Sequence, residues 1–144
     1  MWLLLAGVSL NAQKINEQYD STLAKKYGAN EYGMKSYVLV LLKTGSVVED
    51  NKPRRDSLFD GHMKNINRLA SEGKLVVAGP LAKNDKYRGI FILDTGSLEE
   101  AQLLLETDPA IHAKLLEPEL YRWFGSAALP AYLELDAKVG KFKF

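Results

Sequence analysis

The chain has 144 residues, enough for one domain, and its 47% apolar and 26% charged residues are ordinary for a globular protein. Its 19 basic and 18 acidic residues leave a formal net charge of +1, so no single-sign field favours nucleic acid as a partner. Cysteine is absent, which excludes disulfides, thiolate metal sites, cysteine nucleophiles and lipidation through cysteine.

The first 12 residues predict an export signal. The run from Trp2 to Leu10 is mostly apolar and is followed by small and polar residues, as in the core of a signal peptide. It is shorter than the roughly 20 apolar residues that cross a bilayer, so no stable membrane span is expected. Cleavage is expected near Ala12, and the lack of a preceding basic segment suggests a start codon further upstream. We therefore expect an exported protein, periplasmic or extracellular, in which residues 13–34 form an N-terminal arm.

A strand and a long helix are predicted after this arm. Residues 36–42 are rich in β-branched and aromatic side chains and are followed by Thr44 and Gly45, which indicates a strand with a turn behind it. Residues 55–72 have apolar side chains at helical spacing and are followed by Gly73, which indicates an amphipathic helix. The stripe of this helix consists of Leu58, Phe59, His62, Met63, Ile66, Leu69 and Ala70.

A hairpin and a second helix come next. Residues 74–78 and 88–94 are short apolar segments separated by a polar turn, the pattern of a β-hairpin. Ser97 and Glu100 form a capping box, which opens a helix through about Glu106.

The last elements complete a recognisable order. Asp108 and Pro109 predict a further helical turn, with the aspartate as cap. Residues 119–124 read as a strand, and Pro118 at its entrance is typical of an edge strand. The order strand, helix, strand, strand, helix, strand is that of a ferredoxin-like βαββαβ domain of the α+β class, with a four-stranded antiparallel sheet.

The strands also predict a homodimer. Residues 37–42 and 90–93 are apolar without alternation, which is typical of strands buried on both faces. Because the two helices cover one face, a second copy of the sheet is expected on the other. The C-terminal tail, residues 125–144, either adds cover or reaches the partner.

The topology brings three features to one edge of the domain: His62 in the first helix, Gly79 and Pro80 at the hairpin, and Asp108 after the second helix. The apolar stripe directs the ring of His62 toward the sheet. A half-buried imidazole at the mouth of a cleft suits an acid or base, because its ordinary pKa lies near neutrality.

Several segments, in this order, resemble the YCII-related (YciI-like) family. They are residues 61–63 with Leu69, residues 72–75 leading to 78–80, the capped helix at 97–101, and Asp108 with Pro109. The resemblance spans about residues 35–124 and implies a dimeric α+β barrel with a small cleft. It also implies that a histidine and an aspartate form the active-site pair, which map onto His62 and Asp108. One member type is a dehydrochlorinase, so the resemblance implies a lyase.

Both residues also have structural interpretations. An aspartate before proline is most often a helix cap, and a histidine on an apolar stripe is more often a packed core residue. If both are functional, the carboxylate orients the imidazole while the imidazole moves the proton. Asp108 and His112 are four residues apart, but two ligands without a third make a poor metal site. No nucleophile elbow or glycine-rich phosphate loop occurs, so neither metal nor cofactor is expected.

Two functions from different classes follow. The first is a small cofactor-independent enzyme of the lyase or isomerase type that acts on a small molecule through His62 and Asp108. The second is a non-catalytic dimer that binds a small ligand or a protein in the same cleft. In either case Gly79, Pro80 and Arg55 are expected at the ligand, with the arginine attracting an anionic group.

Overall fold

The computed structural model describes residues 16–141 except residue 84. The predicted export signal lies outside these residues. In the arm, helix α1 (Ser21–Tyr27) begins at Asp20, whose carboxylate accepts hydrogen bonds from the backbone N–H groups of Thr22 and Leu23. Across the described part of the chain, no helix is long and apolar enough to cross a membrane.

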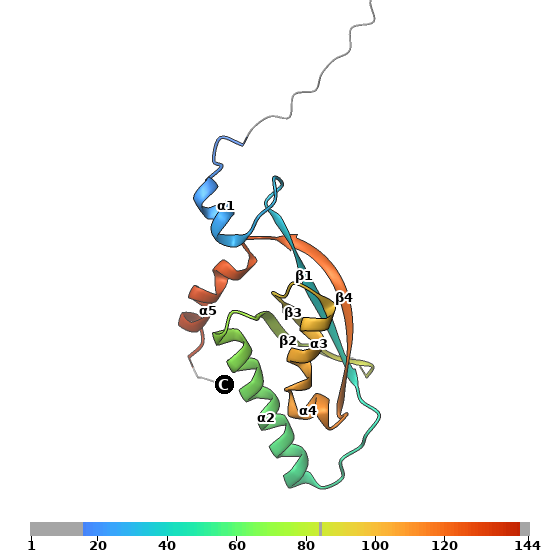
Figure 1. Cartoon of the computed structure of the whole chain (residues 1–144). Helices are drawn as coiled ribbons and strands as arrows, with labels where there is room; N and C mark the ends of the chain where they lie inside the picture. The colour runs from blue at the N-terminus through green and yellow to red at the C-terminus, as the bar shows by residue number, and fades with distance from the viewer. Residues whose placement is uncertain (1–15, 84, 142–144) are drawn as a thin grey trace, which may run out of the picture.

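Four antiparallel strands form the sheet, namely β1 (Met34–Thr44), β2 (Leu75–Pro80), β3 (Tyr87–Leu93) and β4 (Leu116–Ser126). Their order is β2-β3-β1-β4, which leaves β2 and β4 at the edges (Figure 1). This confirms the predicted ferredoxin-like α+β fold.

Three further helices are α2 (Lys52–Ser71), α3 (Leu98–Glu106) and α4 (Pro109–His112). Helix α4 contacts both α2 and α3, and each of the three contacts a strand. They lie together on one side of the sheet (Figure 1). The core fills the space between them and the sheet, because every second residue of β1 points there. Its buried side chains are Val38, Val40, Leu42, Leu69, Leu75, Phe91, Leu93, Ala101, Leu105, Ala110, Ile111 and Leu116.

Some boundaries differ from the sequence-based expectation. Helix α2 begins at Lys52 and not at residue 55, because the side chain of Asn51 accepts a hydrogen bond from the N–H of Arg54. Pro53 is tolerated in this first turn, where its missing N–H has no intrahelical partner to lose. Gly79 and Pro80 belong to β2 and not to the turn behind it. Strand β4 contains Pro118 in its interior, which an edge strand permits.

The tail contains a 3₁₀ helix, η1 (Leu129–Tyr132), and α5 (Leu133–Val139). It is joined to the sheet because the hydroxyl of Tyr132 donates to the carbonyl of Val76. The sequence left the place of the tail open, and the structure puts it beside β2 on the helix-covered side.

The centre of the other sheet face is apolar, β4 adds Tyr121 and Glu119 beside it, and the face carries no helix of the described residues. Residues directly opposite in neighbouring strands share a face, so the register places Leu39, Leu41, Ile90 and Ile92 together there. All four are half-buried. The absence of apolar alternation in β1 and β3 is therefore explained by two apolar faces.

Tyr37 lies at one end of this face and is fully buried. Its ring packs at 5.7 Å from that of Trp123, and its hydroxyl donates to the carbonyl of Ser126 at 2.8 Å. Burial, with a contribution from the Asp94 carboxylate, raises the pKa of Tyr37 from 10.0 to about 12.

This shift predicts a loss of stability at high pH. Between pH 10 and about 12 the unfolded chain loses the Tyr37 proton before the folded chain does, so the free energy of unfolding falls as pH rises. In Tyr37→Phe this contribution is absent, and urea unfolding should show a shallower decline over the same range. Equal slopes for the two proteins would contradict the prediction. Near neutral pH the variant should lose about 1 kcal/mol with the hydroxyl's hydrogen bond.

Candidate active site

Asp108 is a helix cap and a side-chain partner at the same time. Its side chain is completely buried. Oδ1 accepts hydrogen bonds from the N–H groups of Ala110 at 2.9 Å and Ile111 at 3.3 Å, which starts α4. Oδ2 lies 2.7 Å from Nδ1 of His62 and accepts a longer contact of 3.5 Å from the amide of Asn65. The two interpretations of Asp108 left open by the sequence are therefore not exclusive.

His62 is held on three sides. It lies in the middle of α2, is 9% exposed, and stacks on Phe91 with ring centroids 5.9 Å apart and planes at 21°. The ring of Phe59 is nearly perpendicular to that of His62, with centroids 6.2 Å apart and planes at 84°. Because an ionised carboxylate only accepts hydrogen bonds, Nδ1 is the donor in this pair, and Nε2 is left out of the contact.

A glycine permits the close approach that forms this pair. A Cβ on Gly61 would lie 2.7 Å from Cγ of Pro109, far inside normal contact. Gly61 precedes His62 and Pro109 follows Asp108, so the contact of α2 with α4 sets the distance between imidazole and carboxylate. Glycine in a helix interior costs about 1 kcal/mol relative to alanine, and this packing provides its physical reason.

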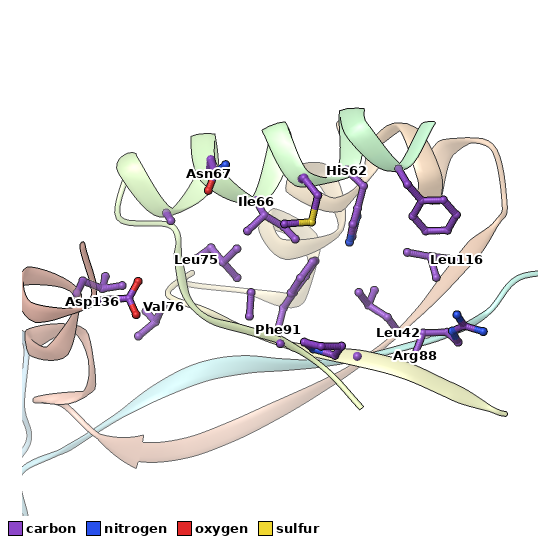
Figure 2. A pocket seen from close by; sticks show the side chains of 18 of the residues that line it. Leu42, His62, Ile66, Asn67, Leu75, Val76, Arg88, Phe91, Leu116 and Asp136 are labelled. Carbon is purple, nitrogen blue, oxygen red and sulfur yellow. The ribbon is translucent and has the colours of Figure 1, made fainter. Parts of the chain in front are cut away.

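The ring of His62 enters a cavity of about 590 Å³ between α2 and the sheet (Figure 2). This volume falls in the range of small-molecule sites. Polar side chains in its lining are His62, Asn67, Arg88, Tyr132 and Asp136, and Gly79, Pro80 and Gly89 contribute backbone. The apolar walls are formed by Leu42, Phe59, Met63, Ile66, Ala70, Leu75, Val76, Ala78, Phe91, Leu116 and Leu133.

The predicted site residues do not all meet. His62, Gly79 and Pro80 line the cavity, and Asp108 lies behind His62. Arg55 is not among the lining residues, because it lies near the start of α2 and its guanidinium donates to the carbonyl of Glu49 at 3.1 Å. Arg88 is the arginine that lines the cavity.

Asn65 supports the pair and was missed by sequence reasoning. It is 7% exposed and one turn beyond His62 on α2, a spacing that brings side chains onto one face. While its amide N–H reaches Asp108, its carbonyl accepts from Arg68 at 2.8 Å and from the hydroxyl of Thr107 at 3.1 Å. Its position three residues after His62 was the sequence signal that could have identified Asn65 as part of the site.

The geometry of the pair suits proton transfer. Within residues 16–141, no cluster of three or more histidine or acidic side chains could hold a metal ion. His112 is exposed on α4. The imidazole of His62, held by Asp108 through Nδ1, lines a largely apolar cavity, where electrostatic effects are stronger than in water.

Fold and site together define a small ferredoxin-like domain with a buried His–Asp pair beside a ligand-sized cavity. The model of the YCII-related domain matches residues 36–123, and the chain belongs to this family. A similar solved structure is 5-chloro-2-hydroxyhydroquinone dehydrochlorinase (TftG) from Burkholderia phenoliruptrix AC1100, in complex with 2,5-dihydroxybenzoquinone. It is 19% identical, the alignment covers 60% of this chain and 92% of that chain, and the TM-score is 0.44. The search of curated proteins gave no match.

Proposed function

We propose that this protein is a small cofactor-independent enzyme of the lyase or isomerase type, in which His62 moves a proton and Asp108 orients its ring. The observation that carries the proposal is the 2.7 Å contact between Nδ1 of His62 and Oδ2 of Asp108 at the wall of an apolar cavity. Membership of the YCII-related family supports a small enzyme-like protein.

The reaction begins at Nε2 of His62, which takes a proton from a C–H or O–H group of the substrate. Asp108 stabilises the imidazolium that forms, as a carboxylate does behind a catalytic histidine. In an elimination, the electron pair of the broken C–H bond forms the new double bond, and the leaving group departs with the electron pair of its bond to carbon. The imidazolium then gives its proton to the leaving group or to water. In an isomerisation, the imidazolium returns the proton at a second position. Neither route requires a cofactor.

Deuterium exchange tests the proposal before the full reaction is known. The purified protein is incubated in D₂O with a panel of carbon acids, including phenols, enols and β-dicarbonyl compounds, and exchange of substrate C–H is followed by NMR. We expect catalysed exchange with at least one compound, and His62→Gln should slow it by about 10²- to 10⁴-fold.

The matched control is His112→Gln, because His112 is exposed and lies outside the cavity lining. This variant should keep the wild-type exchange rate. A folded His62→Gln protein with undiminished exchange would overturn the proposal in favour of a non-catalytic binding protein.

The proposed enzyme is also expected to be an exported homodimer. The apolar sheet face with Leu39, Leu41, Ile90 and Ile92 supports pairing with a second copy, since a contiguous apolar surface favours association. A monomeric mass in solution would contradict the dimer, and a mature native protein that retains Met1 would contradict export.

A further inference from the structure

The far end of the cavity is built by a segment outside the matched domain. We call residues 127–139 the closing segment; the family match ends at residue 123. It is fixed at its start, where buried Ala127 donates its N–H to the carbonyl of Gly33 at 2.9 Å. It is fixed again where the hydroxyl of Tyr132 donates to the carbonyl of Val76. These contacts set the closing segment against β2, so it is part of the site.

The closing segment contributes one charged group to the cavity. Tyr132, Leu133 and Asp136 belong to the lining, and Figure 2 shows Asp136 reaching from α5 at one end. Among the described residues, the Asp136 carboxylate makes no ion pair. Burial raises the pKa of Tyr132, and the negative charge of Asp136 raises it further. The Asp136 carboxylate therefore acts on this end of the cavity.

The opposite end has a positive charge. Arg88 lies on β3 at the other side of the row of lining side chains in Figure 2. The register pairs Leu42 with Gly89 and Lys43 with Tyr87, so Arg88 is the extra residue of a β-bulge. Bulges redirect side chains beside binding sites. Within the part of the chain that is described, the guanidinium of Arg88 has neither an acidic partner nor a hydrogen-bond acceptor.

We propose that the cavity binds an amphoteric molecule, with an anionic group at Arg88, an apolar ring or chain in the middle, and a cationic or hydrogen-bond-donating group at Asp136. Two charges of opposite sign, each without an ion-pair partner, frame largely apolar walls, and a ligand of this pattern complements all three parts. This inference rests on the proposed function, because the ligand would occupy the same cavity as the substrate. It places the middle of the ligand beside His62.

Four matched probes separate the two ends of the ligand. They are 4-(aminomethyl)benzoate, which has both charges, 4-methylbenzoate, which has only the anion, 4-methylbenzylamine, which has only the cation, and p-xylene, which has neither. Binding is measured by NMR titration or calorimetry on the full chain. Each charge should tighten binding by about fivefold, the upper range for partly exposed ion pairs, so the zwitterion should bind best.

Variants then assign each preference to its residue. Arg88→Gln should abolish the gain from the carboxylate and keep the gain from the amine, and Asp136→Asn should do the reverse. Lys64→Gln on α2 and Glu134→Gln on α5 are the charge-matched controls, because both side chains are exposed and neither lines the cavity. These two should leave the order of the probes unchanged.

The inference is overturned if p-xylene binds as tightly as the zwitterion, if no probe binds, or if the preferences survive in Arg88→Gln and Asp136→Asn. It is overturned equally if the controls change the preferences as much as the cavity variants do. His62→Gln distinguishes this test from that of the proposed function. This variant should lose deuterium exchange and keep the charge preferences. A wild-type protein that shows these preferences but catalyses no exchange would refute the enzyme and leave the ligand class standing.

Discussion

Replacing Asp108 by alanine is expected to destabilise the fold by about 2 to 4 kcal/mol. The substitution removes a helix cap, which costs about 1 kcal/mol. It also leaves the buried Nδ1 of His62 without its partner, and an unsatisfied buried group costs about 1 to 3 kcal/mol. Chemical denaturation measures the loss.

Ser97→Ala is the matched control for the cap. Ser97 caps α3 through a hydrogen bond of 3.1 Å from the N–H of Glu100 and has no histidine behind it. Its loss should therefore cost only about 1 kcal/mol. If Asp108→Ala costs no more than Ser97→Ala, the contact with His62 does not stabilise the fold and Asp108 is only a cap.

Asp108→Asn separates stability from chemistry. The asparagine oxygen can still accept the N–H groups of α4, so the fold should be retained. Its NH₂ then replaces Oδ2 opposite Nδ1 of His62, where a donor now faces a donor. We expect the ring to change to the Nε2–H tautomer, visible in ¹⁵N NMR spectra, and deuterium exchange to fall by about 10²-fold or more. An unchanged tautomer with unchanged exchange would contradict the pairing.

Local signals in the sequence placed both residues at one edge of the domain, and the family resemblance implied that they form a pair. An aspartate before proline marks a helix start, and the periodicity of residues 55–72 places His62 on the buried stripe. The fold was predictable for the same reason, since each strand and helix has its own hydrophobic period. The Asp108 carboxylate caps α4 with Oδ1 and contacts His62 with Oδ2. This double role depends on the packing of α2 against α4, which no local sequence pattern encodes.

The ends of the cavity could not be predicted in this way. Arg88 lines the cavity at a bulge that interrupts the pairing of β3, and a bulge has no fixed sequence period. The closing segment is placed by contacts from Ala127 and Tyr132 to backbone carbonyls far away in the chain. Arg55, by contrast, was assigned to the substrate from its expected place at a loop edge, but lies in α2 with Glu49 as its neighbour.

Gly61→Ala is expected to destabilise the protein although alanine is the better helix former. Helix propensity alone favours alanine by about 1 kcal/mol. The new Cβ, however, would lie 2.7 Å from Cγ and 3.2 Å from Cβ of Pro109, a rigid ring that cannot rotate away. Overpacking of this kind costs about 1 to 3 kcal/mol, so we expect a net loss of about 1 to 2 kcal/mol. Moving α2 away from α4 should also lengthen the His62–Asp108 contact and reduce deuterium exchange.

A double-mutant cycle with Pro109→Ala tests this cause. Shortening the proline removes the nearest atom, Cγ, so Gly61→Ala should be less destabilising in the Pro109→Ala background than in the wild type. Equal effects in the two backgrounds, or a stabilising Gly61→Ala in the wild type, would show that the helix contact does not constrain the site. The expected coupling would instead identify Gly61 as the residue whose missing side chain lets α2 bring the imidazole to the carboxylate.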